Sequence, residues 1–267
     1  MRGAALALAS LCLAAPACAD GSAPAPQMVP PVAEGYLSPP ELEALAASVP
    51  PPPAEGSDEA RADVAASERL RALEDSDRWL LATRHAELRP ALALSHFDCA
   101  LGFRLTAAES PRLVALLTRV LHDADEAAEL AKARMPRSRP VAVDSGRRAC
   151  QVLSEAGRTS NAYPSGSASV GAAYGAVMAV LAPDRAEAVD RIGHEIAVSR
   201  MVCGVHYPSD VVAGEALGRQ LFDALTGSSA FIIEAAAARV EVEAARAAGQ
   251  TSPSCAAERA ALATPLP

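Results

Sequence analysis

Three short clusters of polar residues have the types and spacing needed to bind and transform an anion. The first contains Lys132 and Arg139, which are separated by six residues and followed by Pro140. Lys132 is the chain's only lysine, and every other Lys/Arg position holds arginine. An ammonium and a planar guanidinium bind anions differently, so a site that rejects arginine is one explanation of this lysine. A solvated helix end is the other explanation, and the cluster taken alone favours it.

The second cluster is the segment Tyr163-Pro164-Ser165-Gly166-Ser167. A Ser-Gly turn that enters a helix presents free backbone N–H groups at the positive end of the helix dipole, and this arrangement binds anions readily. An ordinary helix cap uses the same residues. Taken alone, the segment favours the cap, and its meaning depends on the other two clusters.

The third cluster contains Arg200, then His206 after five residues, then Asp210 after three more. Pro208-Ser209 is typical of the start of a helix, which places Asp210 in the first turn, close to His206. A carboxylate bound to one ring nitrogen fixes the tautomer and leaves the other nitrogen free for nucleophilic attack. The alternative is a surface histidine beside an aspartate.

In chain order, these clusters resemble the three-part signature of the type 2 phosphatidic acid phosphatase superfamily. This superfamily contains the bacterial non-specific acid phosphatases and the vanadium haloperoxidases. The closer resemblance is to the class A, secreted acid phosphatases, because Pro50–Pro53 followed by Ala54-Glu55-Gly56-Ser57 is similar to the proline-rich opening of that group. The resemblance extends from about Tyr36 to Leu225.

The resemblance implies a role for each residue of the three clusters. The phosphate-binding residues would be Lys132, Arg139, Ser165, Gly166 (through its N–H) and Arg200. His206 would be the nucleophile that attacks phosphorus to give a phosphohistidine, and Asp210 would hold its imidazole ring. This chemistry requires no metal ion or other cofactor, and the chain contains no HExxH or CxxC ligand pattern. Phosphate or vanadate is expected to bind as a ligand or inhibitor.

Two positions depart from the family pattern. Ser167 stands where the family has the histidine that protonates the leaving oxygen, and a serine hydroxyl is too weak an acid for that role. Such catalysis typically contributes about 10²–10⁴-fold, so a slower enzyme is expected. Pro136 lies between Lys132 and Arg139 and should end or kink a helix there. The histidines outside the motifs are expected to be structural or exposed: His85, His96, His122 and His194.

Composition predicts the scaffold that must position these residues. Aromatic residues are only 3% of the chain and alanine dominates the apolar set, which favours helices over strands. We therefore expect one all-α domain. The net charge of −8 argues against a nucleic-acid surface. After the N-terminal segment, no run reaches the roughly 18 apolar residues of a membrane span, and 170–182 is predicted to be a buried helix.

Capping signals and apolar spacing locate the helices. Ser57 is typical of an N-cap, and Ser110-Pro111 is typical of another helix start. Polar loops are expected at 141–164 and 203–208. The predicted helices are 41–48, one or two within 58–88, 111–134, 165–181, 184–201, 209–225 and 232–247.

The chain's ends read as appendages to this domain. Residues 1–19 resemble an export signal with cleavage after Ala19, and lipid attachment at Cys18 is the weaker alternative. Residues 20–35 are expected to be a Pro/Ala-rich linker, 36–247 the phosphatase domain and 248–267 a flexible tail. Four cysteines follow the signal, and they allow either disulfides in three pairings or buried free thiols: Cys99, Cys150, Cys203 and Cys255.

The sequence therefore predicts an exported acid phosphatase, periplasmic or secreted, that hydrolyses small phosphomonoesters through a phosphohistidine on His206. Two alternatives remain. One is a non-catalytic phosphate-binding pseudoenzyme, since Ser167 replaces the acid. The other is a vanadium-dependent haloperoxidase, which uses the same cradle for vanadate. A homo-oligomer is possible, and no nucleic-acid partner is expected.

Overall fold

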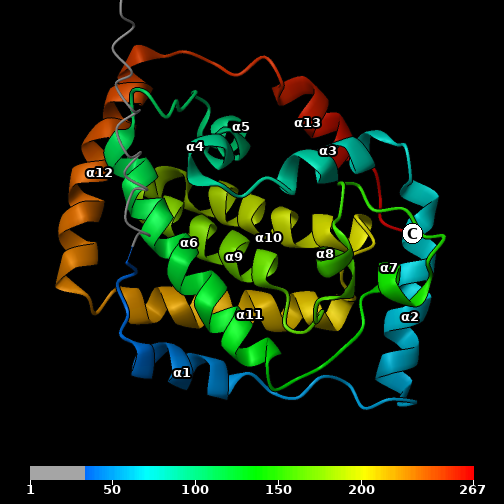
Figure 1. Ribbon diagram of the computed structural model, residues 1–267. Coiled ribbons are helices and arrows are strands. Elements are labelled where there is room, and N and C mark those ends of the chain that lie inside the picture. Colours follow the sequence, from blue (N-terminus) through cyan, green and yellow to red (C-terminus); the bar gives the residue numbers. More distant parts are fainter. Residues whose placement is uncertain (1–33) are drawn as a thin grey trace, which may run out of the picture. The chain divides into compact units, whose positions relative to one another are not determined.

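The computed structural model describes residues 34–267 (Figure 1). The expected signal, residues 1–19, and most of the expected linker, 20–35, lie outside the described residues. Within the described range the regular elements are all helices, which confirms the all-α prediction. In that range no single helix is long and apolar enough to cross a membrane, and only the helices Pro208–Leu225 and Ser229–Ala248, bent by 96° relative to each other, pass that test jointly.

The elements follow one another along the chain with short connections. The helices, with three short 3-10 helices marked η, are α1 (Pro39–Ser48), α2 (Asp58–Leu70), η1 (Arg71–Leu73), α3 (Asp77–His85), α4 (Pro90–Ala93), η2 (Leu94–His96), α5 (Asp98–Leu101), α6 (Pro111–Lys132), α7 (Pro140–Val143), α8 (Glu155–Thr159), α9 (Gly166–Leu181), η3 (Pro183–Arg185), α10 (Ala186–Val202), α11 (Pro208–Leu225), α12 (Ser229–Ala248) and α13 (Cys255–Leu262).

Helix α9 lies at the centre and packs against α6, α10 and α11 (Figure 1). Most of its residues are buried, as predicted for the Ala/Gly-rich segment 170–182, because a helix that is apolar all round must be covered on every side. Small residues allow the close approach of α10. A Cβ on Gly193 would lie 2.6 Å from the backbone oxygen of Gly171, so this contact requires glycine. The central pair thereby fixes where α9 and α10 present their site residues.

Helix α6 packs along α9 and carries the first cluster at its C-terminal end. Leu113, Leu116, Leu117 and Val120 are fully buried at helical spacing, which confirms the predicted amphipathic helix. Helices α1 and α12 cover other parts of α6. The helix start predicted at Ser110-Pro111 is also confirmed.

A smaller apolar cluster lies near the third motif. It packs Leu70, Trp79 and Val141 against Val202 and Val205, the residues on either side of the turn that leads to His206. A disulfide between Cys150 and Cys203 belongs to the same cluster. The cluster therefore fixes the end of α10 and the turn after it.

The structure differs from the predicted elements in three places. The loop expected over 141–164 contains α8 and most of α7, and α4 and α5 were not predicted, because one-turn helices give too short a pattern to detect. The tail expected to be flexible, 248–267, contains α13. Cys255 at its start forms a disulfide with Cys99, and Glu258 pairs with Arg84. These long-range contacts, which no local pattern reveals, hold the segment on the domain.

Candidate active site

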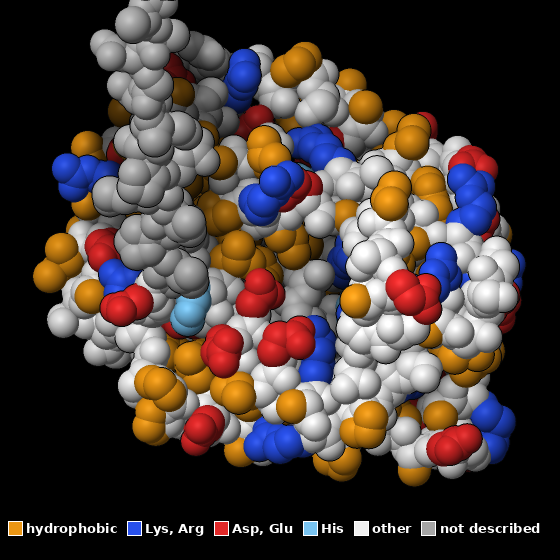
Figure 2. Space-filling view, in the orientation of Figure 1, with side chains coloured by type: hydrophobic (Ala, Val, Ile, Leu, Met, Phe, Trp, Pro, Cys, Tyr) orange, Lys and Arg blue, Asp and Glu red, His pale blue; other side chains and the backbone are white. Residues whose placement is uncertain are grey.

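The three clusters meet at one cavity of about 220 Å³. Its walls come from the end of α6, the start of α9, the end of α10, the turn before α11, and the segment 151–160. The lining residues are Asp125, Lys132, Arg139, Gln151, Leu153, Gly157, Ser160, Gly166, Ser167, Arg200 and His206. Figure 2 shows this face of the molecule hollowed near α6 and α9, with acidic and basic side chains at the edges. Ser165 and Asp210 lie behind the lining.

His206 is almost fully buried, with 2% of its surface exposed. Its Nε2 lies 3.1 Å from a terminal nitrogen of Arg139. A guanidinium can only donate, so Nε2 is the acceptor and the ring proton lies on Nδ1. Burial lowers the pKa of His206 to about 3, and the positive charges of Arg139 and Arg200 act in the same direction. The imidazole is therefore neutral at mildly acid pH, with a lone pair on Nε2.

Asp210 faces the other side of the ring. Its Oδ2 lies 3.6 Å from Nδ1 of His206, close enough to favour the proton on that nitrogen although longer than a hydrogen bond. The same oxygen accepts from the Tyr207 backbone N–H at 2.7 Å. The predicted placement of Asp210 in the first turn of α11, beside His206, is confirmed.

Arg137 holds Asp210 in place, although no sequence pattern marks this arginine as a site residue. Its guanidinium donates to Oδ1 of Asp210 at 2.5 Å and to Oδ2 of Asp63, on α2, at 2.7 Å. It also lies over the ring of Tyr207, 4.6 Å from the centroid. Arg137 is part of the six-residue spacer of the first motif, where nothing local distinguishes it from other arginines; its partners come from distant segments.

Lys132, Arg139 and Arg200 all line the cavity, as predicted. Lys132 is paired with Glu129 at 2.5 Å. In the described chain neither arginine forms an ion pair with a carboxylate: Arg139 donates to the Ser160 and Val205 carbonyls and Arg200 to the Gln151 side chain. The Arg200 Nε is buried without a hydrogen-bond partner among the described residues.

Burial weakens the charged state of both arginines, and repulsion adds to this effect at Arg200. Burial lowers the pKa of Arg200 to about 10, with the charge of Arg139 adding to the effect. The pKa of Arg139 is also lowered, again by burial. Two guanidinium groups held together in this way bind an anion strongly, because the anion supplies the missing countercharge and hydrogen-bond acceptors.

Pro136 lies in a loop between Lys132 and Arg139, and both of these cations nevertheless line the cavity. Helix α6 stops at Lys132, and Arg139 is the residue that precedes α7. The intervening loop is held where the Asn161 side chain donates to the Lys132 carbonyl at 3.0 Å. The two cations therefore reach one cavity from two elements, not from one helix face.

The second cluster forms the start of α9, as predicted. The hydroxyl of Ser165 accepts from the Ala168 N–H at 3.3 Å and so caps the helix, while its own N–H donates to the Asp210 carbonyl at 2.9 Å. The buried Ser165 is thus a capping residue behind the cavity wall. Gly166 lines the cavity at the positive end of the helix.

Ser167 lines the cavity, and the other described histidines lie away from it. His85 bonds to Ser199 and His96 to the Glu87 carbonyl. His122 and His194 lie beside Asp123 and Glu215. Of the described histidines, His206 is the one that lines the cavity.

Gln151 is a second site residue that the sequence did not reveal. Its side-chain oxygen accepts from Arg200 at 3.2 Å. The neighbouring Cys150 is bound to Cys203, three residues after Arg200. The disulfide therefore holds the wall segment against the end of α10. No sequence signal marks this role, because the segment is irregular and lies about fifty residues away in the chain.

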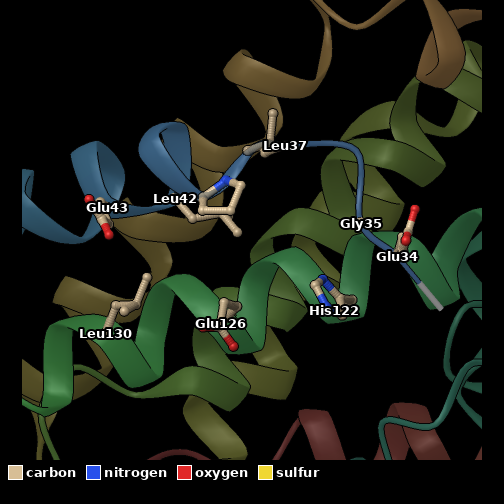
Figure 3. Close-up of a pocket in the computed structure, with 9 residues that line it drawn as sticks. Glu34, Gly35, Leu37, Leu42, Glu43, His122, Glu126 and Leu130 are labelled. Carbon is tan, nitrogen blue, oxygen red and sulfur yellow. The ribbon is translucent and has the colours of Figure 1, made fainter. Parts of the chain in front are cut away.

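A second, larger cavity of about 580 Å³ borders another face of α6 (Figure 3). His122, Glu126 and Leu130 line it from α6, and Leu42 and Glu43 line it from α1. Its charged side chains are carboxylates (Glu34, Glu43 and Glu126), so it does not resemble an anion site. Among the residues that the structure describes, no group of three or more His, Cys, Asp or Glu side chains is arranged to hold a metal ion.

The chain is similar to several known proteins. A family model described as the PAP2 superfamily matches residues 113–226. An acid phosphatase of Zymomonas mobilis is 35% identical over 202 residues, which cover 75% of this chain and 76% of that protein. A non-specific acid phosphatase of Providencia stuartii is 33% identical over 169 residues, covering 62% and 68%. A solved transmembrane PAP2-type phosphatidylglycerolphosphate phosphatase from Bacillus subtilis aligns with 70% of this chain and 91% of its own, at 21% identity and a TM-score of 0.46.

Proposed function

The chain belongs to the PAP2 superfamily and is an acid phosphatase of it, and we propose that it hydrolyses phosphomonoesters through a phosphohistidine formed on His206. One observation carries this proposal. Arg139 and Arg200 lie together in a small cavity beside a buried neutral histidine, and among the described residues neither has a carboxylate partner. Such an arrangement is costly unless an anion binds, and a phosphoryl group supplies the charge and the acceptors.

The bound phosphate is expected to use every wall of the cavity. Lys132, Arg139 and Arg200 would bind its oxygens from α6, the segment before α7, and α10. The backbone N–H of Gly166 at the start of α9 would donate to one oxygen, and the positive end of the helix favours the same charge. Ser165 would act by holding this turn in place through its cap.

His206 would then act as the nucleophile. Its lone pair on Nε2 attacks phosphorus, the P–N bond forms, and the P–O bond to the alcohol breaks. The proton on Nδ1 faces Asp210, which stabilises the positive charge that develops on the ring. Because burial lowers the pKa of His206 to about 3, the nucleophile stays unprotonated at the acid pH where the phosphohistidine is made. Water then hydrolyses the phosphohistidine.

Ser167 stands at the position that the family fills with its acid histidine, so the leaving oxygen receives no proton from there. Esters with stable leaving groups, such as p-nitrophenolate, need no such help, whereas alkoxides do. The second step would also slow, because the family histidine is the natural base for the attacking water. A burst of product is therefore expected with p-nitrophenyl phosphate.

We further propose that the protein is exported. Residues 1–19 resemble an export signal. All four cysteines of the described chain pair, as Cys99–Cys255 and Cys150–Cys203, and disulfides persist mainly in oxidising compartments. Sequencing the N-terminus of the protein recovered outside the cytoplasm tests this, with Asp20 expected as the first residue.

The activity is tested with p-nitrophenyl phosphate from acid to neutral pH, with and without vanadate. Turnover that vanadate inhibits and that His206→Ala abolishes is the expected result. Binding of phosphate without any turnover would instead establish the non-catalytic pseudoenzyme. Halide oxidation in the presence of vanadate and peroxide would establish the haloperoxidase.

A further inference from the structure

We propose that Asp125 acts as the general acid that protonates the leaving oxygen in place of the absent histidine, an inference that rests on the proposed phosphatase function. Asp125 lies on α6, seven residues before Lys132, which is about two helical turns and therefore the same face. Both side chains line the active-site cavity. No sequence motif singles out this aspartate.

The carboxyl group lies beside the start of α9, next to the position of the missing imidazole. A Cβ built on Gly166 would be 3.3 Å from Nζ of Lys132 and 3.9 Å from Oδ1 of Asp125. The same point is 3.4 Å from the Cβ of Ala128, the residue between them on this face of α6. Glycine at 166 thus lets the phosphate-binding ammonium and the carboxyl group come to the same edge of the helix N-terminus that Ser167 follows.

The carboxyl group also lies on the side from which the leaving group departs. In phosphoryl transfer the attacking and leaving atoms are roughly in line through phosphorus. His206, the nucleophile, is buried at the base of the cavity, so the leaving oxygen must point toward the mouth. Asp125 lines the cavity while part of its surface remains exposed to solvent, which places it at that mouth. An acid placed there reaches the oxygen that needs the proton.

The other groups that line the cavity do not supply this proton. Arg139 and Arg200 are guanidinium groups, which do not release protons in a proton-transfer step. Lys132 is paired with Glu129 and binds the phosphate charge. Leu153, Gly157, Ser160 and Gln151 carry no acid. Among the described lining residues, Asp125 is the one carboxylic acid.

The surroundings of Asp125 favour the protonated form. Partial removal from water raises the pKa of this carboxyl group, and the charge of Glu129 raises it further, while Lys132 and His122 act in the opposite direction. The charged and titratable groups that face it across the cavity from other elements are Arg139, Arg200 and His206. The raised pKa leaves a larger share of this carboxyl group protonated at acid pH than an exposed aspartate would have, under conditions where the nucleophile is already neutral.

The proton of the Asp125 carboxyl group moves to the ester oxygen as the P–O bond breaks and the bond from phosphorus to His206 Nε2 forms. The alcohol leaves neutral, and Asp125 remains as a carboxylate. In the second step this carboxylate accepts a proton from the water that attacks phosphorus, the P–N bond breaks, and both groups return to their starting states.

Asp125→Asn removes the acid at constant size and is the principal test. Its kcat/KM on an alkyl phosphate such as glycerol phosphate should fall by about 10²–10⁴-fold, while hydrolysis of p-nitrophenyl phosphate should change by less than about 10-fold, since that leaving group needs no proton. Adding Ser167→His to this variant should restore the alkyl phosphatase activity. Glu126→Gln, the adjacent carboxylate that lines the other cavity, is the matched control and should change neither rate.

The pH profile separates an acid from a residue that merely positions Lys132. With the alkyl phosphate, kcat/KM of the unmodified protein should decrease as pH rises through the raised pKa of Asp125, and this decrease should be absent in Asp125→Asn. Equal losses on both substrates, or retained activity on the alkyl phosphate, would overturn the proposal. No turnover of either substrate by the unmodified protein would overturn the phosphatase function and this inference together.

Discussion

Two cavities border different faces of α6. The smaller, about 220 Å³, is lined by Lys132, Arg139, Arg200, the start of α9 and the buried His206. The larger, about 580 Å³, is lined by carboxylates and apolar side chains (Figure 3). Size therefore does not identify the site in this protein. What distinguishes the smaller cavity is buried positive charge that lacks a partner, beside a neutral histidine.

Among the variants that compare the two cavities, removing that charge should give the largest effect. Arg200→Ala deletes a donor to the transferring phosphoryl group, and we expect kcat/KM on p-nitrophenyl phosphate to fall by about 10²–10³-fold. Stabilisation by millimolar phosphate in a thermal unfolding experiment should disappear as well. Without phosphate the variant should be at least as stable as the parent, because Arg139 and Arg200 repel each other.

Arg148→Ala is the matched control for Arg200. The side chain of this arginine is exposed, pairs with Asp75 and lines neither cavity, so its loss should leave phosphate binding and turnover unchanged. Retained phosphate stabilisation in Arg200→Ala, or equal losses in the two variants, would contradict the distinction drawn between the cavities.

Replacing Arg137, which holds Asp210 beside His206, should have the next largest effect on stability and turnover. Arg137→Met leaves the buried carboxylates of Asp63 and Asp210 without their shared partner, and breaking such a pair costs about 3–5 kcal/mol of unfolding free energy. The value of kcat should fall too, since Asp210 no longer has a fixed orientation. Denaturant unfolding and p-nitrophenyl phosphate kinetics measure both changes.

Arg61→Met supplies the comparison for Arg137. This residue also pairs with an aspartate on α2, Asp58, but both side chains are exposed, and such pairs contribute about 0–1 kcal/mol. Similar small losses in the two variants would show that the Asp63–Arg137–Asp210 bridge does not hold the site together.

The unfolding free energy should also decrease as the pH is lowered. Burial lowers the pKa of His206 to about 3 and of His96 to about 4, and it lowers the pKa of His85 as well. Unfolded histidines titrate near 6.5, so below that pH the unfolded chain binds protons that the folded chain does not. The unfolding free energy should therefore fall between about pH 6.5 and 5, by up to about 1.4 kcal/mol per pH unit for each such histidine.

Denaturant unfolding at several pH values measures this slope. His96→Gln keeps a donor for the Glu87 carbonyl but does not titrate, so its slope should be shallower than that of the parent. An unchanged slope in this variant would mean that His96 gains its proton in the folded protein.

The smallest effect is expected in the larger cavity. Glu126→Gln removes one of its carboxylates, which does not line the smaller cavity and forms no ion pair with Lys132, Arg139 or Arg200. Turnover should stay within about 2-fold of the parent. A loss as large as that of Arg200→Ala would mean that the two faces of α6 belong to one functional unit.

The sequence predicted the parts of this architecture that rest on local patterns. Apolar spacing located α6, and Ser57 and Ser165 each cap the helix start that was predicted for them. The motif residues Lys132 and His206 proved to line one cavity. Local pattern suffices here because each signal lies within one or two helical turns.

Other residues could not be predicted, because their roles arise from distant partners. Arg137 matters through Asp63, more than seventy residues earlier. Gln151 matters because a disulfide brings its segment to α10. Asp125 is an ordinary acidic residue of an amphipathic helix until α9 is placed against it. The prediction of a flexible C-terminal tail was wrong for the same reason, because a disulfide joins Cys255 to the distant Cys99.

The central claim, that His206 carries the phosphoryl group, is tested most directly by trapping the intermediate. The protein is mixed with p-nitrophenyl phosphate, denatured under alkaline conditions that preserve phosphohistidine, digested, and measured by mass spectrometry. The account predicts one added phosphoryl group on the peptide that contains His206, forming together with a burst of p-nitrophenol. Turnover without this labelled peptide, and undiminished in His206→Ala, would contradict it.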